Sequence, residues 1–307
     1  MKLTQIRALV AIAETGSIRA AAARVGVTQP ALSKALQALE EELSVPLVHR
    51  TSRGVNLTPF GQAVVTRGRG IAQEVDRLRE QIGQMRGASQ GTVSLAVSPS
   101  PAVVILPRAL ARFRKEHPEV RLQIREAVYP DTLQMLREGL ADIAIGAHPQ
   151  IKGGKQPEFL VTRLYFNRLV VTGRTGHPKA HARSLAELLD CDWLLHGPEE
   201  GPGAMYAPVF KAHQLTPPTP SVISQSFIAT LTLLERSDAL TMLPERLIQS
   251  LIASRRLIVL PIRGLTPRLD VSTIVRANQP LTPVAQKLLH WIRRTAPQEP
   301  DPTDVAW

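Results

Sequence analysis

Two glycines divide the first 43 residues into three short helical segments, and this pattern limits the fold more than any other feature. Apolar residues recur at helical spacing before Gly16, and four consecutive alanines lie in the segment Ile18–Val25 before Gly26. Ser17 and Thr28 suit the N-caps of the second and third helices. The third segment carries leucines at steps of four, three and four residues, namely Leu32, Leu36, Leu39 and Leu43. Two short helices, a glycine turn and an amphipathic third helix are typical of a helix-turn-helix.

Residues 44–58 predict a basic hairpin next to this motif. Leu47–Val48 and Val55–Leu57 can pair as two short strands, and Arg50 and Arg53 then lie at the tip. The chain has a formal net charge of +11, and five of these charges lie in the first 90 residues. Such an excess favours a polyanionic partner, either nucleic acid or an anionic membrane. The hairpin is what the wing of a winged helix-turn-helix requires.

The start of the third helix is the end that enters the major groove in such domains. Gln29 is suited to an adenine edge, Ser33 to several bases, and Lys34 to phosphates. Taken singly, each could be an ordinary solvated residue, but the combination favours double-stranded DNA. The predicted DNA-binding residues are Arg19, Thr28, Gln29, Pro30, Ser33, Lys34, Arg50, Thr51 and Arg53.

Residues 59–89 predict one long helix that pairs with a second copy. Thr58 suits its N-cap and Pro59 its first position. Apolar residues then step by four, three, four and three, at Ile71, Val75, Leu78, Ile82 and Met85. Such a stripe could pack on its own domain, but the steady 3.5-residue period favours a coiled-coil homodimer.

From Gly91 onward, strands and helices alternate. The predicted strands are Thr92–Ser98, Val120–Glu126, Asp142–Ala147, Leu169–Val171, Val222–Gln225, Ala239–Leu243, Leu257–Leu260 and Val271–Val275. The predicted helices are Ala102–His117, Thr132–Glu138, Leu185–Leu188, Ala204–His213 and Ile228–Glu235. This alternation predicts one or two α/β domains with largely parallel sheets.

The chain resembles the signature of LysR-type transcriptional regulators in the stretch SIRAAAARVGVTQPALSKALQALEEELSVPLVHRTSRGVNLTPFG. Further matches are VSLAVSPS, FRKEHPEVRLQI, LREGLADIAIG and LPERL, so the resemblance covers most of the chain. Within the family it looks most like regulators of toluenesulfonate and other aromatic-acid degradation. The resemblance implies a cytoplasmic bacterial regulator, a homodimer that assembles into a homotetramer. Promoter half-sites, a small-molecule effector and RNA polymerase are the implied partners.

The resemblance also implies an effector half that folds like a type 2 periplasmic binding protein. The expected domains are a winged helix-turn-helix at 1–58, a linker helix at 59–89 and an effector domain at 90–296. Within the effector domain we expect subdomain I at about 90–160 and 267–296, and subdomain II at about 161–266. Residues 297–307 are Pro- and Asp-rich and predict a disordered tail.

A cleft between the two subdomains is the expected effector site. Ser100 suits an N-cap and Pro101 the first helical position, so free N–H groups there could bind an anion. In the family this loop contacts the effector, and the loop 196–203 is expected to face it. Tyr129 and Phe227 could flank an aromatic ring. The predicted effector-binding residues are Ser98, Pro99, Ser100, Ala102, Tyr129, His148, Gly197, Pro198, Gly201, Gly203 and Phe227. We expect an anionic aromatic effector, with Glu199 and Glu200 pointing outward because unpaired carboxylates are costly to bury. If they pointed inward, they would disfavour a carboxylate or sulfonate and favour a cationic or hydroxylated effector.

Two other classes of protein are less consistent with the sequence. An enzyme would need a catalytic or cofactor-binding motif, and none is recognised; we expect no cofactor, no metal site, and a buried, inert thiol at Cys191. A transport solute-binding protein would need an export signal and would have no use for residues 1–87. The sequence contains no run of 18 uncharged apolar residues, so it predicts no membrane-spanning helix.

Overall fold

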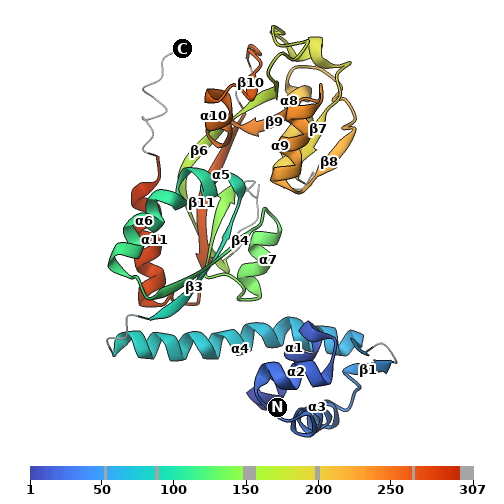
Figure 1. Ribbon diagram of the computed structural model, residues 1–307, viewed down its shortest axis with the longest axis vertical. Helices are drawn as coiled ribbons and strands as arrows, with labels where there is room; N and C mark the ends of the chain where they lie inside the picture. Colours follow the sequence, from blue (N-terminus) through green and yellow to red (C-terminus); the bar gives the residue numbers. More distant parts are fainter. Residues whose placement is uncertain (52–53, 87–89, 148–156, 198–200, 265–266, 298–307) are drawn as a thin grey trace. The chain divides into compact units, whose positions relative to one another are not determined.

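Two units make up the chain, which is coloured along its sequence in Figure 1. The computed structural model describes residues 1–51, 54–86, 90–147, 157–197, 201–264 and 267–297. Unit 1 comprises Met1–Ala88 with Arg137–Ala141, and unit 2 comprises Ser89–Leu136 with Asp142–Trp307.

Unit 1 contains three short helices, a hairpin and a long helix. Its elements are α1 (Leu3–Thr15), α2 (Ile18–Val25), α3 (Gln29–Leu43), β1 (Val48–Thr51), β2 (Gly54–Leu57) and α4 (Pro59–Met85). The predicted span of the second helix and the predicted start of the third agree with these bounds. The core contains Leu9 and Ile12 of α1 and Leu32, Leu36 and Leu39 of α3. Leu43, the fourth leucine of the predicted stripe, is exposed because α3 ends there.

The predicted caps fix the turns between these helices. Gly16 and Gly26 end α1 and α2 in the left-handed conformation, with φ of 65° and 77°. Ser17 Oγ accepts from the Ala20 amide at 3.4 Å, and Thr28 Oγ1 accepts from the Ala31 amide at 3.4 Å. The chain therefore turns twice within a few residues, as a helix-turn-helix requires.

Unit 2 is an α/β structure with two lobes, each with its own core. The first lobe contains β3 (Gly91–Val97), α5 (Pro99–Val104), α6 (Leu106–Glu116), β4 (Val120–Glu126), α7 (Asp131–Arg137), β5 (Ile143–Ala147) and α11 (Pro283–Thr295). Helices α6 and α11 lie side by side against the sheet (Figure 1). Phe113 and Leu288 from these helices pack on Val93, Leu95 and neighbouring strand residues.

The second lobe contains shorter elements. They are η1 (Leu185–Leu188), β7 (Leu194–His196), η2 (Pro202–Met205), α8 (Tyr206–Ala212), β8 (Val222–Ser224), α9 (Phe227–Arg236), β9 (Thr241–Pro244), α10 (Glu245–Ala253) and β10 (Leu257–Val259). One cluster surrounds Trp193 and Phe210, whose rings meet edge to face at 5.2 Å, and another contains Leu234 and Leu243. Among the described residues, no helix is long and apolar enough to cross a membrane.

Two long strands, β6 (Phe159–Arg174) and β11 (Arg268–Arg276), connect the lobes. They lie next to each other in a seven-stranded sheet with the order β10-β6-β11-β5-β3-β4, and β9 also pairs with β6. The end of β6 pairs with β9 and β10 in the second lobe, from Leu169 onward. The crossing that the family resemblance implies near residue 160 thus falls at the start of β6, and the strand changes partners about nine residues later.

The prediction of largely parallel sheets is wrong for this central region. Strands β3, β4 and β5 are parallel, but β6 and β11 run antiparallel to each other, and β11 runs antiparallel to β5. The reason is that both crossing strands belong to the connections between the lobes, and not to successive strand–helix–strand units.

The predicted helix Ala102–His117 is broken in two. Helix α5 ends at Val104 and α6 begins at Leu106, with Pro107 in its first turn. A proline within a continuous helix would leave the Val103 carbonyl without its usual amide partner and would clash with the preceding turn. Ile105 takes up the break, with φ −108° and ψ −50°.

Candidate functional site

The predicted DNA-reading side chains are accessible at the start of α3. Gln29, Pro30 and Lys34 are exposed, Ser33 is half-buried, and Arg19 is exposed on α2. Thr28 is exposed, although its hydroxyl caps α3. Except for Arg19, these residues lie at the N-terminal end of α3, where the helix dipole favours an anionic partner.

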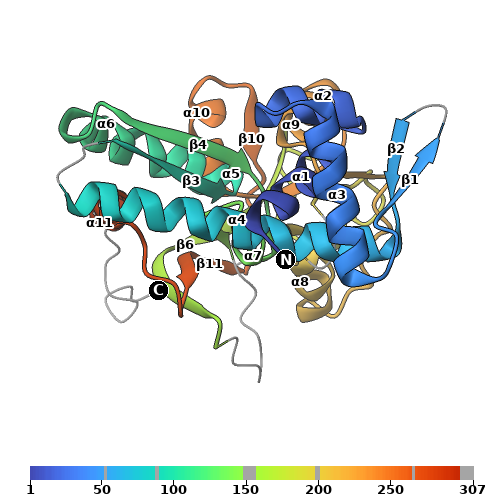
Figure 2. The same cartoon turned by 90° about the horizontal axis from the view of Figure 1, so that it is seen from below.

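The β1–β2 hairpin forms the predicted wing, and Figure 2 shows it projecting from unit 1. Thr51 is exposed, and its Oγ1 donates to the Gly54 carbonyl at 3.1 Å. Arg50 lies on β1 opposite Val55, and Arg53 lies outside the described residues. The Val55 amide donates to the Gly16 carbonyl at 2.9 Å, which ties the wing to the turn between α1 and α2. A Cβ at Gly54 would lie 2.7 Å from that carbonyl oxygen, so this close approach requires glycine.

A cavity of about 100 Å³ lies in unit 2 where the two lobes meet the crossing strands. The first lobe contributes the start of α5, the segment before α7 and the end of β5, while the second contributes β7, η2, β9 and α10. An engineered apolar cavity of ~150 Å³ admits benzene, so this space suits a small molecule and not a polymer.

Five predicted effector-binding residues line this cavity: Ser98, Pro99, Ser100, Tyr129 and Gly201. Four others in the described chain are not among its lining residues: Ala102, Gly197, Gly203 and Phe227. Ala102 packs instead against the core of the first lobe, and Phe227 against a core of the second. His148 and Pro198 lie outside the described residues, as do Glu199 and Glu200.

The start of α5 differs from the prediction, because Ser98 and not Ser100 occupies the N-cap position. Pro99 takes the first helical position, since its fixed φ suits that position and its missing N–H costs nothing there. Pro101 also lacks an N–H, and the Ser98 amide already donates to the Ile145 carbonyl at 2.9 Å. The first turn of α5 therefore offers one amide donor, that of Ser100, instead of the cluster that an anion site needs.

Asn167 and His196 also line the cavity although neither was among the predicted effector-binding residues; His196 does belong to the loop 196–203 that was expected to face the site. Asn167 of β6 is only 1% exposed, and its Nδ2 donates to Ser100 Oγ at 2.7 Å. Ser100 Oγ lies 3.3 Å from the hydroxyl oxygen of Tyr165 on the same strand. The Oδ1 atom of Asn167 has no hydrogen-bond partner among the described residues. Asn167 has no distinct signal in the sequence, because Arg163 and Arg168 are also polar residues of this strand.

His196, at the end of β7, is the second of these residues and is 8% exposed. Its Nδ1 lies 3.1 Å from Thr230 Oγ1, and that hydroxyl donates to the Ser226 carbonyl at 3.0 Å. Because the Thr230 hydroxyl hydrogen already bonds the Ser226 carbonyl, Nδ1 of His196 carries the ring proton and donates it to Thr230 Oγ1. Burial lowers the pKa of His196 from its ordinary value of 6.5, which favours the neutral ring. Nε2 is then an acceptor, and no residue in the described part of the chain donates to it.

This lowered pKa predicts a pH-dependent contribution of His196 to stability. The unfolded chain binds the proton more tightly than the fold does, so the contribution is complete above pH 6.5 and is lost as the pH falls below that value. We expect the midpoint of thermal unfolding to fall less between pH 7.5 and pH 5.5 in His196→Phe than in the unmodified protein. If calorimetry gave equal falls of the unfolding midpoint in the two proteins, His196 would not be the source of this pH dependence.

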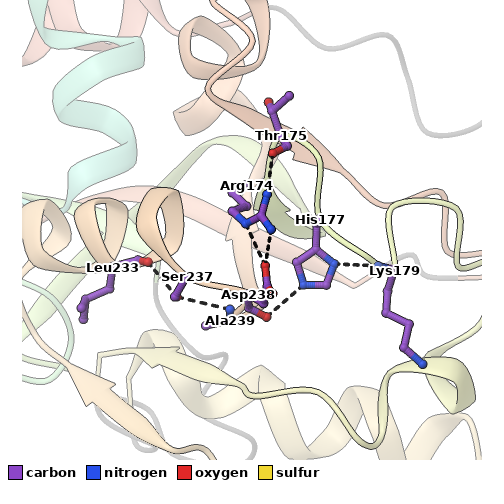
Figure 3. Close-up of polar contacts among 8 residues, drawn as sticks. All are labelled: Arg174, Thr175, His177, Lys179, Leu233, Ser237, Asp238 and Ala239. Carbon is purple, nitrogen blue, oxygen red and sulfur yellow. Dashed lines mark hydrogen bonds and ion pairs between the residues drawn. The ribbon is translucent and has the colours of Figure 1, made fainter.

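A second buried histidine, His177, has a purely structural role, in contrast to the role considered for His196 (Figure 3). Its Nδ1 accepts from the Lys179 amide at 3.0 Å, and its Nε2 lies 2.9 Å from the Asp238 carbonyl, to which it donates. Arg174 pairs with the Asp238 carboxylate at 2.7 Å in the same cluster. Both ring nitrogens of His177 are thus satisfied by protein, whereas one nitrogen of His196 is not.

Cys191 lies in the turn before β7 and is half-buried, less buried than predicted, against the Trp193 cluster. Burial raises the pKa of its thiol, and Asp190 adds to the effect. A thiol that stays protonated is a weak nucleophile. This environment is that of a packing residue.

Comparisons with known proteins agree with these two units. Residues 3–62 match the family model for the bacterial regulatory helix-turn-helix protein of the lysR family, and residues 86–297 match the LysR substrate binding domain. The SDS degradation transcriptional activation protein of a Pseudomonas strain is 29% identical over 292 residues, which cover 93% of this chain and 94% of that protein.

Solved structures share the fold of the whole chain. The crystal structure of CbnR, a LysR family transcriptional regulator, superposes with a TM-score of 0.71 at 21% identity, covering 97% of this chain and 100% of that one. Full-length CbnR complexed with its target DNA gives a TM-score of 0.70 at 22% identity, over 96% of this chain and 100% of the CbnR chain. The predicted fold class is confirmed by these matches.

A winged helix-turn-helix unit and a two-lobed α/β unit in one chain define a DNA-binding transcriptional regulator with an effector-binding domain. The chain belongs to the LysR family of bacterial regulators. Its relatives are transcriptional regulators and not enzymes.

Proposed function

We propose that this regulator reads promoter DNA with the start of α3 and the wing, and that a small molecule in the cleft between the lobes of unit 2 controls it. The observation that supports this control is the cavity itself. Its wall includes Ser98 from the first lobe and Met205 from the second. A ligand there would contact both lobes, so it would bind one angle between them more tightly than another and shift that equilibrium.

The sequence predicted an anionic aromatic effector, and the described lining supports only part of that. Tyr129 lies in the wall and can contact a ring, but Phe227 does not line the cavity. The described lining residues include no lysine or arginine. They favour a small, largely apolar ligand and give no support to a negative charge.

Filling the cavity tests this proposal. Ala204→Phe and Ala147→Leu add volume at two lining residues, one in each lobe. We expect both variants to keep the affinity for promoter DNA but to lose the thermal stabilisation by effectors that the unmodified protein shows. Effectors identified in a small-molecule screen that still stabilise both variants would show that control does not operate through this cleft.

Specific and nonspecific DNA contacts should respond differently to substitution. Gln29→Ala and Ser33→Ala should weaken binding to the operator by about 1–3 kcal/mol per lost base contact and leave random DNA unaffected. Lys34→Ala should weaken both and lower the salt slope of log K by about 0.9 for one lost phosphate contact. Fluorescence anisotropy at several salt concentrations measures both. Equal losses on operator and random DNA for Gln29→Ala would contradict its role in base reading.

The proposed assembly is a homodimer formed through the apolar stripe of α4, and two such dimers form a homotetramer. The stripe residues Ile71, Leu78, Ile82 and Met85 are exposed in a single chain. A dimer places two winged units on half-sites a whole number of helical turns apart. RNA polymerase as a partner and a cytoplasmic location remain predictions of the family resemblance.

A further inference from the structure

The cleft contains two hydrogen-bond acceptors that the described residues do not satisfy. Oδ1 of Asn167 on the crossing strand β6 and Nε2 of His196 in the second lobe are buried, and neither has a partner in the described part of the chain. Leaving one such acceptor unpaired typically costs ~1–3 kcal/mol, so most are paired in folded proteins. Both residues line the cavity, which makes a ligand the natural source of the missing donors.

Both atoms are fixed as acceptors by bonds on their other sides. Asn167 uses its amide nitrogen on Ser100 Oγ at 2.7 Å, which leaves the amide oxygen free. His196 uses Nδ1 on Thr230 Oγ1, whose hydrogen is committed to the Ser226 carbonyl. The Phe227 ring packs edge-on against the imidazole with centroids 5.6 Å apart, which restricts its rotation.

We infer that the effector is an uncharged, mostly apolar small molecule with two hydrogen-bond donors, such as hydroxyl or amide N–H groups, which bind Asn167 Oδ1 on the crossing strand β6 and His196 Nε2 in the second lobe. This inference rests on the proposed function of the cleft. A carboxylate or sulfonate would place its oxygens against two acceptors, with no described cation in the lining to compensate. A site built to bond donors also rejects analogues that lack them, because its own polar atoms are then left unpaired.

A ligand of this kind would connect a crossing strand directly to the second lobe. Asn167 lies on β6 just before the strand changes partners from the first lobe to the second, and His196 lies at the end of β7. One molecule bonded to both would favour a particular distance between them. The second donor is therefore required for control and not only for affinity.

The test is a thermal-shift and calorimetric screen of the full-length protein with three sets of size-matched fragments. The first set is uncharged with two donors (benzamide, resorcinol and 1,4-benzenedimethanol are members), the second uncharged without donors (N,N-dimethylbenzamide and 1,3-dimethoxybenzene), and the third anionic (benzoate and toluenesulfonate). We expect stabilisation by the first set. Stabilisation confined to the second or third set, or none by any donor-bearing fragment, overturns the inference.

His196→Phe separates ligand recognition from structure. Phenylalanine removes the unpaired acceptor and leaves Thr230 bonded to Ser226, so the ligand-free protein should be as stable as before or more so. We expect roughly tenfold weaker binding of donor-bearing fragments, the loss of about one hydrogen bond, with no change for the other sets. Asn167→Leu should give the same selective loss. A uniform loss across all sets would contradict the role of these acceptors.

His177→Phe is the matched control, because it removes a buried histidine from the same lobe whose nitrogens are both satisfied by protein. It should lower the unfolding midpoint and leave fragment affinity unchanged. Anionic fragments that lose binding in Ala204→Phe would overturn the inferred ligand class and leave the cleft as the control site. If no cavity substitution changes the affinity of any fragment, the proposed function is overturned as well.

Discussion

The variant Leu78→Glu/Ile82→Glu should be monomeric and should bind operator DNA at least a hundredfold more weakly. Leu78 and Ile82 are 54% and 50% exposed, in a stripe that Ile71 and Met85 extend at 47% and 74%. Burying one large apolar side chain contributes ~1.5–3 kcal/mol, so pairing two stripes stabilises a dimer substantially. A carboxylate on the stripe removes that burial and places like charges opposite each other.

The loss of DNA affinity follows from losing the second copy. In a dimer, binding of one winged unit holds the other near its half-site, and this effective concentration raises affinity by 10²–10⁴. Sedimentation velocity and DNA titrations with one or two half-sites measure the two effects. Gln84→Glu is the control, because it adds a negative charge to α4 outside the stripe. If the double variant remained dimeric, the dimer contact would lie elsewhere on the chain. Circular dichroism would show whether the variant is folded.

Gly61→Ala should destabilise unit 1 by about 3 kcal/mol, at the upper end of what overpacking usually costs. An ideal Cβ at this position would lie 2.0 Å from the Leu47 carbonyl oxygen, and that atom belongs to backbone. The same oxygen accepts from the Thr58 amide at 3.0 Å, while Thr58 Oγ1 donates to the Pro46 carbonyl at 2.7 Å. Moving the chain apart would break these bonds and shift Leu47, which is fully buried.

Gly26→Ala is the informative comparison for this prediction. No atom lies within 4 Å of the added Cβ there, so its cost comes from the positive φ of 77° alone. We expect ~1 kcal/mol for that strain, against the larger cost of the clash at Gly61. Hydrogen exchange of the Thr58 amide and thermal unfolding would measure the difference. Similar losses in both variants would mean that the turn at Leu47 relaxes freely.

Local sequence predicted several helix boundaries of unit 1, because each of these depends on a residue with a backbone preference. Gly16 and Gly26 end helices, Thr28 and Thr58 cap them, and Pro59 starts α4. The observed bounds of α2 and the first residues of α3 and α4 match the prediction. These effects act over four residues or fewer, so no tertiary contact is needed to recognise them.

Unit 2 was predicted less completely, since long-range pairing decides its elements. The sequence predicted a strand only at Leu169–Val171, yet β6 runs from Phe159 to Arg174. Polar residues such as Arg163 and Asn167 interrupt the apolar pattern, but β11 pairs along the strand and extends it. The predicted helices also omitted α10 and α11, whose buried faces pack on other parts of the unit.

The sequence by itself determined the class of this regulator, its helix-turn-helix boundaries and the exposed stripe of α4. It also placed Ser98, Ser100 and Tyr129 in one wall of the cleft. Only the tertiary structure decided which polar atoms of the cleft remain free. Asn167 and His196 are far apart in sequence, and their hydrogen-bond partners come from other elements. Whether an acceptor is satisfied depends on every neighbour in space, and no pattern along the chain records that.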